Sequence, residues 1–316
     1  MIQKDVTFKR LGLVVVDEQH KFGVAQRAVL RRKGQAPHCL VMTATPIPRT
    51  LAMTAFGDLD LSILDEMPPG RRPVQTRYVS REETVQAFEF IRGEIKKGRQ
   101  AYFVYPLIEE SDTLTLKSAQ QMYRRLGKSV YPDLKVGLLH GRMKSAEKDR
   151  VMADFRARRL HILVSTVVIE VGIDVPNATL MVIDHAERFG LAQLHQLRGR
   201  IGRGRYQGYC LLFAEPTTEE AERRIAILTQ TTDGFRIAEE DLKLRGPGEF
   251  LGARQHGLPE LRLASLIDDA DLLRLARKEA FDLVAADPAL AAPQHQALRD
   301  HLRRKLARRP GLTPIG

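Results

Sequence analysis

The sequence lacks any long apolar run, and its 316 residues include only two cysteines, Cys39 and Cys210. None of its apolar stretches approaches the ~20 residues that a helix needs to cross a bilayer. Its first residues do not have the pattern of a secretory signal peptide. The two cysteines form neither a Cys-x-x-Cys pair nor the spacing of a metal site. We therefore expect a cytoplasmic protein in a reducing environment, without membrane association.

The sequence does have a large excess of positive charge. It contains 50 lysines and arginines against 39 aspartates and glutamates, which gives a net charge of +11. Such an excess favours a polyanionic partner, and nucleic acid is the first candidate. The chain is long enough for about two domains of ~100–200 residues each. Its hydrophobic content of 43% suits ordinary globular cores.

A stretch with closely spaced arginines, residues 196–203, carries the strongest functional signal. On a helix, Gln196, Arg200 and Arg203 would fall at positions i, i+4 and i+7 and would share one face. Two guanidiniums one turn apart repel each other, so they need an external anion. A polyphosphate fits, because guanidinium binds phosphate through two hydrogen bonds and keeps its charge. The alternative interpretation is a solvated basic helix face.

A short apolar run at residues 13–16 predicts a parallel strand that is buried on both faces. Asp17 and Glu18 follow it, at the end of the strand where α/β folds bind their ligands. Asp17 would hold Mg²⁺ through water, as the metal-binding aspartate of a nucleotide hydrolase does. Glu18 would orient and deprotonate the attacking water. The alternative is an acidic strand end that binds no metal.

Three further loops after predicted strands offer polar groups to a ligand. Residues 43–45 place small hydroxyls at a strand end, where they can bridge two parts of a catalytic site by hydrogen bonds. Residues 140–142 place a basic side chain beside a glycine, which suits a phosphate. Residues 165–174 offer hydroxyls and backbone N–H groups. Ordinary turns and a capped helix start are the alternatives at these loops.

The chain alternates short strands with helices, which predicts a doubly wound parallel α/β sheet. A stretch rich in proline and glycine at residues 68–73 predicts a linker between two such units. Ser145 is expected to cap the helix at residues 146–156. Around residues 245–252, three glycines and a proline interrupt a charged helical sequence. This interruption predicts two short helices joined by a turn.

The order of these stretches resembles that of the superfamily-2 helicases. The matching stretches correspond to the motifs numbered II, III, V and VI, and they are residues 17–20, 43–45, 165–174 and 196–203. Any one of these motifs is common, but their joint occurrence in this order is specific. The resemblance implies RecA-like domains that bind a nucleotide.

Further stretches narrow the resemblance to one branch of that superfamily. Residues 42–50 and 189–200 resemble the branch that the RecG-type helicases share with the transcription-repair coupling translocases. Residues 241–257 resemble their common translocation motif, a helical hairpin that couples ATP hydrolysis to movement on duplex DNA. The sequences at residues 17–20, 245–252 and 262–266 favour the RecG type.

The resemblance implies cofactors and residue roles. ATP and Mg²⁺ are the implied cofactors, with Asp17 as the magnesium carboxylate and Glu18 as the catalytic base. Arg200 and Arg203 resemble arginine fingers that reach the γ-phosphate. The other implied residues are Gly172, Asp174 and Gln196 for nucleotide binding; His20, Thr43 and Thr45 for coupling hydrolysis to DNA contact; and Arg142, Thr166, Arg245 and Gln255 for DNA contact.

The resemblance also predicts the domain organisation. Residues 1–67 would form a partial first RecA-like domain, and residues 68–75 would form the linker. Residues 76–230 would form a complete second RecA-like domain. Residues 231–316 would form the translocation hairpin and a carboxy-terminal helical region.

The sequence departs from the family pattern at its start. It contains no Gly-x-x-x-x-Gly-Lys-Ser/Thr, the loop that cradles the β- and γ-phosphates. The amino-terminal wedge with which RecG-type helicases read branched DNA is absent too. We therefore expect the chain by itself not to hydrolyse ATP appreciably. We also expect the sheet of its first domain to be left with an exposed edge and uncovered apolar faces.

The sequence therefore predicts that the chain is the carboxy-terminal part of an ATP-dependent DNA helicase that acts on branched or duplex DNA. Such an enzyme remodels stalled forks and Holliday junctions in recombination and repair. We expect a monomer, with a single-stranded-DNA-binding protein as a partner. Two alternatives remain open. One is a transcription-repair coupling translocase, and the other is a truncated, non-catalytic DNA-binding module whose binding would weaken steeply with salt.

Overall fold

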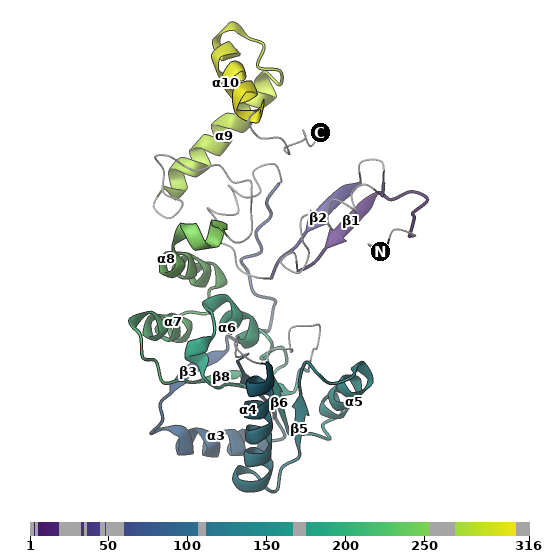
Figure 1. Cartoon of the computed structure of the whole chain (residues 1–316), viewed down its shortest axis with the longest axis vertical. Helices are drawn as coiled ribbons and strands as arrows, with labels where there is room; N and C mark the ends of the chain where they lie inside the picture. The colour runs from purple at the N-terminus through teal and green to yellow at the C-terminus, as the bar shows by residue number, and fades with distance from the viewer. Residues whose placement is uncertain are drawn as a thin grey trace. The chain divides into compact units, whose positions relative to one another are not determined.

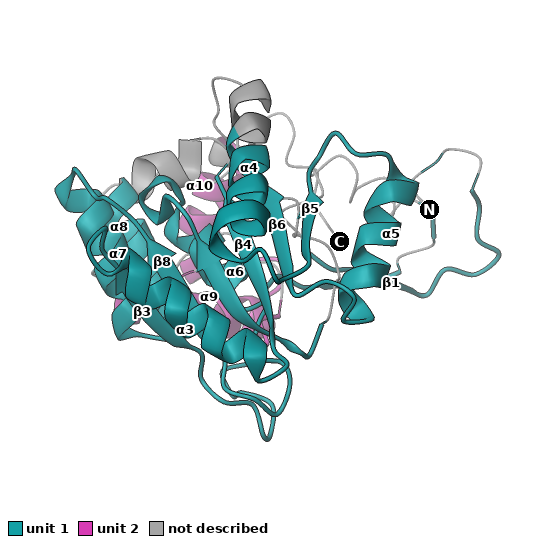
Figure 2. Ribbon diagram, turned by 90° about the horizontal axis from the view of Figure 1, so that it is seen from below, with its two compact units in different colours: residues 1–47, 64–245 teal, residues 48–63, 246–316 magenta. Residues whose placement is uncertain are grey.

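A computed structural model describes residues 3, 6–18, 33–34, 37–44, 48, 60–106, 112–166, 175–252 and 269–307. The chain divides into two compact units (Figure 2). The first comprises residues 1–47 and 64–245, and the second comprises residues 48–63 and 246–316. The basic stretch at residues 21–33 and the apolar stretch at residues 50–56 also favour helices in the sequence, and all of these residues except residue 33 lie outside the described part of the chain.

The strands and helices follow one another along the chain as in Figure 1. The strands are β1 (Leu13–Val16), β2 (His38–Val41), β3 (Gln75–Val79), β4 (Gln100–Tyr105), β5 (Val136–Leu139), β6 (Ile162–Thr166), β7 (Ala178–Ile183) and β8 (Tyr209–Phe213). The helices are α3 (Thr84–Lys96), α4 (Asp112–Arg125), α5 (Ser145–Arg156), α6 (Leu191–Arg198), α7 (Glu219–Gln230), α8 (Gly234–Gly252), α9 (Ala270–Ala286) and α10 (Gln296–Ala307), with short turns of other helix types at Leu126–Val130, Ala186–Arg188 and Pro293–His295.

Six strands form a parallel sheet, here called the large sheet, in the order β3-β8-β7-β4-β6-β5. The chain first moves outward through β4 to β5 and then returns through β6 and β7 to β8. Because parallel crossovers are right-handed, this reversal places the helices of the two halves on opposite faces. Residues of α3 and α4 pack on one face, and residues of α5 to α8 pack on the other. The prediction of a doubly wound parallel sheet is confirmed.

The centre of the large sheet is apolar on both faces. All six residues of β4 are buried. Tyr102 and Val104 pack into the core beneath α5 and α6, while Phe103 and Tyr105 pack beneath α3 and α4. This alternation is the period of a strand, and the continuous apolar run is typical of a strand covered by helices on both sides.

Strands β1 and β2 form a second, small sheet, and they pair in parallel as predicted. Val14 and Val16 are buried, but Leu13 and Val15 are 57% and 52% exposed. The prediction that this strand is buried on both faces is therefore wrong. Successive side chains of a strand point to opposite faces, and the face of Leu13 and Val15 is not covered. The expectation that this sheet has an uncovered apolar face is confirmed.

Helix α8 is longer than the sequence predicts. It continues through Gly246, Pro247 and Gly248 to its end at Gly252, so the predicted turn at this proline is wrong. Ile237 and Leu242 anchor the first half of the helix in the core. Once that half is formed, each further residue except Pro247, which has no N–H, can add a hydrogen bond to the helix. The predicted hairpin partner, residues 253–257, lies outside the described residues.

Helix α5 begins one residue earlier than predicted. Its cap is Lys144, and Ser145 is already the first helical residue, so the predicted Ser145 cap is wrong. The carboxylate of Glu147 accepts a hydrogen bond from the Lys144 N–H at 3.2 Å. This reciprocal bond from the third helical residue fixes the start of the helix at Lys144.

The second unit contributes α9 and α10. Residues 261–285 carry apolar residues at helical spacing; residues 261–268 lie outside the described residues, and residues 270–285 lie in α9. Asp287 follows α9 and accepts hydrogen bonds from the N–H groups of Ala291 at 2.8 Å and Ala292 at 2.9 Å. The described part of the chain contains no helix that is both long and apolar enough to cross a membrane.

Candidate functional site

The segment with the two candidate finger arginines is a turn rather than a helix face. Helix α6 ends at Arg198, and Gly199 caps it. Further along the turn, Gly202 has a φ of +68°, a left-handed conformation that favours glycine. Arg200 and Arg203 therefore lie beyond the helix, and the predicted shared helical face with Gln196 is wrong. Arg203 is exposed and Arg200 is half-buried.

The arginine of this segment that enters the core is Arg198, which the sequence reading did not single out. Its side chain is 3% exposed. Its Nη1 donates hydrogen bonds of 2.8 Å to the carbonyl oxygens of Leu228 and Thr231, at the end of α7. Arg198 thus fixes α6 against α7 and positions the turn that follows. No local sequence signal distinguishes it from Arg200, because its partners lie about 30 residues further along the chain.

The turn at residues 199–206, here called the arginine turn, also packs against the segment that enters β3. Arg71 donates a hydrogen bond from Nη2 to the Gly199 carbonyl oxygen at 3.2 Å. A Cβ atom added at Gly202 would lie 3.0 Å from Cγ2 of Val74, which is a tight contact, and the positive φ of Gly202 also disfavours other residues. The turn is thereby held next to the predicted linker. Arg203 Nε adds a 3.4 Å hydrogen bond to the same Gly199 carbonyl.

The carboxyl edge of the large sheet carries two of the four predicted DNA-contact residues, Arg142 and Thr166. Arg142 follows β5 and is exposed, and Thr166 ends β6 and is buried. Because β5 and β6 are paired neighbours, the structure brings the loop of Arg142 and the end of β6 to one edge. Lys148 Nζ donates to the Gly141 carbonyl oxygen at 2.8 Å and fixes the Arg142 loop. Gly172 and Asp174 lie outside the described residues.

The same edge has a polar cluster that the sequence reading missed. Asp184 follows β7, and its carboxylate accepts a hydrogen bond from the Tyr105 hydroxyl at the end of β4. Burial raises the pKa of Asp184. His185 has a left-handed backbone, with φ at +50°, and its Nδ1 lies 3.3 Å from Oε1 of Glu187. A hydrogen bond with Glu187 raises the pKa of His185. Polar residues directly after the apolar run of β7 were the signal available in the sequence.

The small sheet brings together the predicted residues of its two strands. Asp17 and Glu18 follow β1, and Thr43 follows β2, which is its parallel neighbour. The Met42 N–H donates to the Val16 carbonyl oxygen at 2.8 Å, so the two strand ends are level. Asp17 Oδ1 accepts the Glu18 N–H at 2.8 Å. His20 and Thr45 lie outside the described residues.

The donor set at the end of β1 suits a magnesium ion rather than a transition metal. Mg²⁺ is usually held by one or two carboxylates together with water and substrate phosphates. Asp17 supplies one exposed carboxylate of this kind. The part of the chain that the structure describes contains no cluster of three or more His, Cys, Asp and Glu residues that could enclose a metal. A metal at Asp17 would therefore depend on nucleotide phosphates and water for its remaining ligands.

Arg245 lies on α8 and meets the start of α6. Its Nε is 3.1 Å from Oδ1 of Asp241, one turn earlier on the same helix. A Cβ atom added at Gly190, the cap of α6, would lie 2.5 Å from Arg245 Nη2, so the guanidinium rests directly on this glycine. The structure thus connects α8 with the helix that leads to Arg200. Gln255 lies outside the described residues.

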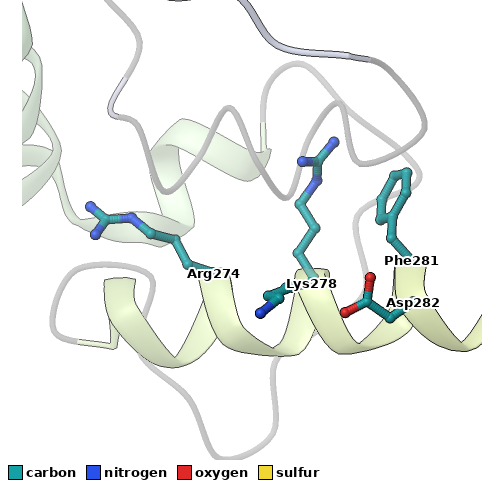
Figure 3. Close-up of a pocket in the computed structure, with 5 residues that line it drawn as sticks. Arg274, Lys278, Phe281 and Asp282 are labelled. Carbon is teal, nitrogen blue, oxygen red and sulfur yellow. The ribbon is translucent and has the colours of Figure 1, made fainter.

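In the second unit, α9 carries a shallow hollow of about 290 Å³ (Figure 3). Arg274, Lys278, Phe281 and Asp282 line it, together with Arg277, whose guanidinium lies 4.6 Å from the centre of the Phe281 ring. All five side chains come from one helix. We assign no ligand to this hollow.

The comparisons with known proteins agree with this geometry. The helicase conserved C-terminal domain family matches residues 82–205, and the family described as ATP-dependent DNA helicase RecG, domain 3, C-terminal, matches residues 231–309. The ATP-dependent DNA helicase RecG of Synechocystis sp. is 56% identical over 292 residues, which are 92% of this chain and 35% of that protein. RecG of Thermotoga maritima is 57% identical over 279 residues, which are 88% of this chain and 36% of that protein.

A solved structure of RecG bound to a three-way DNA junction is also similar. It is 52% identical, with a TM-score of 0.65, and the match covers 86% of this chain and 35% of that one. The chain thus spans about a third of the length of these relatives. These matches confirm the resemblance found in the sequence motifs. The chain belongs to the RecG-type helicases and corresponds to their carboxy-terminal portion, a RecA-like helicase domain followed by domain 3.

Proposed function

We propose that the chain is the part of an ATP-dependent DNA helicase that completes the nucleotide site and moves on duplex DNA. The whole enzyme would remodel stalled forks and Holliday junctions in recombination and repair. The observation that carries this proposal is the 52% identity to a RecG protein whose structure was solved on a three-way DNA junction. The fixed arginine turn after α6 and the contact between Arg245 and Gly190 support it.

The nucleotide chemistry would divide between the two predicted RecA-like domains, residues 1–67 and 76–230, joined by the linker at residues 68–75. ATP with Mg²⁺ is the proposed cofactor. Asp17 would hold the metal and Glu18 would activate the attacking water. Arg200 and Arg203 would neutralise charge that develops on the γ-phosphate, while Gly172, Asp174 and Gln196 would contact the nucleotide.

Movement on DNA would depend on the carboxyl edge of the large sheet and on residues 231–316. Arg142 and Thr166 would contact backbone phosphates, together with Gln255 of the translocation hairpin. Arg245 would transmit the state of the nucleotide, because its guanidinium rests on Gly190 at the start of the helix that leads to Arg200. His20, Thr43 and Thr45 would link hydrolysis to DNA contact in the first domain.

On this proposal, the protein would act as a monomer. It would associate with a single-stranded-DNA-binding protein where forks stall. It would work in the cytoplasm.

A fusion protein tests the proposed roles. The amino-terminal part of the Thermotoga maritima relative is joined to this chain at the start of the matched region, and ATP turnover and junction unwinding are measured. We expect activity in the fusion and a loss of about 10³-fold or more in kcat for Arg203→Ala, the range reported for arginine fingers. Arg223→Ala is the matched control, because this exposed arginine pairs with Glu219 on the surface of α7.

The purified chain without the fusion gives a second test. We expect it not to hydrolyse ATP appreciably, because it has no Gly-x-x-x-x-Gly-Lys-Ser/Thr loop. Strong ATP turnover that disappears in Glu18→Gln would contradict this expectation. An inactive fusion combined with salt-sensitive DNA binding by the chain would instead favour a non-catalytic DNA-binding module.

A further inference from the structure

A basic hollow lies at the amino edge of the large sheet, opposite the carboxyl edge that carries Arg142. Its residues have no part in the proposed function. Its volume is about 350 Å³. Lys97 and Arg99 line it from the turn between α3 and β4, Arg158 from the turn after α5, and Arg205 and Tyr206 from the end of the arginine turn. We call this site the amino-edge hollow. Four of the side chains that line it are cationic.

Tyr206 holds two of these cations in fixed positions. The Arg99 guanidinium carbon lies 3.2 Å from the centre of the Tyr206 ring, and that of Arg205 lies 4.9 Å from it. Arg205 also donates a hydrogen bond from Nη2 to the Tyr206 hydroxyl at 2.7 Å. Cation–π contacts of this kind stabilise a guanidinium by ~0.5–2 kcal/mol each and leave N–H donors free for a ligand.

The backbone beneath the hollow is held by a chain of buried amides. Asn177 Nδ2 donates to the Gly98 carbonyl oxygen at 2.9 Å and to Oε1 of Gln100 at 3.0 Å. Gln100 Nε2 in turn donates to the carbonyl oxygens of Phe155 at 2.6 Å and Leu160 at 2.7 Å. These bonds connect the segments before β4, β6 and β7. The cationic side chains therefore project from a frame that needs no reorganisation when a ligand binds.

The positive charge of the hollow is only partly balanced by the protein. Lys97 pairs with Glu94 at 2.6 Å. Among the residues that the structure describes, no carboxylate forms an ion pair with Arg99, Arg158 or Arg205. The ends of α3 and α5 lie close to these arginines in the chain, and each contributes roughly half a negative charge. The two helix ends together offset about one of the three positive charges of Arg99, Arg158 and Arg205. About two positive charges are therefore left for a ligand to neutralise.

Phosphate diesters match the excess positive charge of the hollow better than a free base or a carboxylate does. Guanidinium forks bind phosphate oxygens through paired hydrogen bonds. A stacked base is disfavoured, because the Arg99 guanidinium already covers a face of Tyr206. We propose that the amino-edge hollow binds about two adjacent backbone phosphates of DNA. Recognition of this kind would be independent of sequence.

The bound DNA segment would differ from the one at the carboxyl edge. Strand β4 has six residues, and a strand rises ~3.3 Å per residue, so the two edges lie about 20 Å apart. One phosphate cannot contact both edges. On the proposed function, on which this inference rests, the second segment is another arm of the branched substrate.

Fluorescence anisotropy of a labelled three-way junction with the purified chain tests the proposal. The double variant Arg158→Ala/Arg205→Ala removes two exposed cations and leaves the buried frame intact. We expect several-fold weaker binding near 0.15 M salt, and a slope of log affinity against log salt that is smaller by about two. The matched control is Arg159→Ala, an exposed arginine next to Arg158 that pairs with Asp154. The Arg158→Lys/Arg205→Lys variant should recover most of the affinity, because it keeps the charge.

An unchanged affinity and salt slope in the Ala double variant, with an unchanged melting temperature, would overturn the proposal. Arg142→Ala at the carboxyl edge separates this failure from a failure of the proposed function. If Arg142→Ala weakens DNA binding and the Ala double variant does not, the proposed function stands and the hollow has no part in it. No change in either variant would contradict both. Tripolyphosphate binding that depends on Arg158 and Arg205, without any effect on DNA affinity, would identify a free phosphate compound as the ligand and overturn the DNA assignment.

Discussion

The Nδ1 atom of His195 lies 3.0 Å from Nη2 of Arg198, one turn further along α6. Burial, and then the charge of Arg198, lowers the pKa of His195 to about 4. The pKa in the unfolded chain is ~6.5. Between these two values the unfolded chain binds more protons, so the free energy of unfolding falls as the pH falls. At pH 5 we expect the folded state to have lost about 2 kcal/mol relative to pH 7.5 through this group.

Urea unfolding of the chain at pH 7.5 and pH 5 measures this loss. His195→Asn is the matched variant, because its Oδ1 takes the position of Nδ1 and can accept the Arg198 hydrogen bond without gaining a proton. The variant should show a smaller fall in the free energy of unfolding between the two pH values. An equal fall in the variant and the unaltered chain would show that His195 is not the group responsible.

Arg198 itself is expected to contribute strongly to stability. Its Nη1 satisfies the carbonyl oxygens of Leu228 and Thr231 in the core. Arg198→Met keeps the length of the side chain and leaves both carbonyls without this donor. The free energy of unfolding should fall by about 2–4 kcal/mol, measured by denaturant titration. Arg223→Met on the exposed side of α7 should change it by no more than ~0.5 kcal/mol, and an equally small effect of Arg198→Met would contradict the prediction.

Arg198 also shows where sequence reasoning reached its limit. The spacing of Gln196, Arg200 and Arg203 predicts one helical face, but the helix ends at Arg198. Gly199 caps it, and the turn that follows contains Gly202, whose left-handed backbone approaches Val74 from the segment before β3. A contact between segments so far apart in the chain has no signature in the local sequence. The same reason explains why the buried arginine could not be distinguished from its neighbours.

The strands of the large sheet were easier to predict. β4, β6 and β7 are mostly apolar and all their residues are buried, so short apolar runs that alternate with helices were enough to predict a parallel sheet covered on both faces. For α8, local propensity favoured a break at Pro247, but core contacts of its first half outweigh that preference. The helicase motifs indicated the family, because their residue types and their order can be read directly from the sequence.

The two cysteines should differ in reactivity. Cys210 is fully buried in β8, and burial raises its pKa to about 12, so almost none of it is thiolate near neutral pH. Cys39 lies half-buried on β2. Iodoacetamide at pH 8, followed by mass spectrometry of digested protein, should modify Cys39 first and Cys210 only after urea unfolding. Rapid modification of Cys210 in the native chain would contradict the packing of β8.

The contact of Arg245 with Gly190 yields a prediction that separates function from stability. In Gly190→Ala, the added Cβ would lie 2.5 Å from Arg245 Nη2, so the flexible guanidinium must move. Because the end of a side chain can swing aside, the free energy of unfolding should change by less than ~1 kcal/mol. DNA-stimulated ATP turnover of the fusion should nevertheless fall, as it should in Arg245→Ala.

A double-mutant cycle and a second glycine make this test specific. If both substitutions act through one contact, the double variant Gly190→Ala/Arg245→Ala should be no slower than Arg245→Ala alone. Gly93→Ala is the matched control, because an added Cβ there meets nothing within 4 Å in the middle of α3. It should leave turnover unchanged and stabilise the helix by ~0.5–1 kcal/mol. Normal turnover in Gly190→Ala would show that this contact only packs α8 on α6 and does not couple DNA binding to ATP hydrolysis.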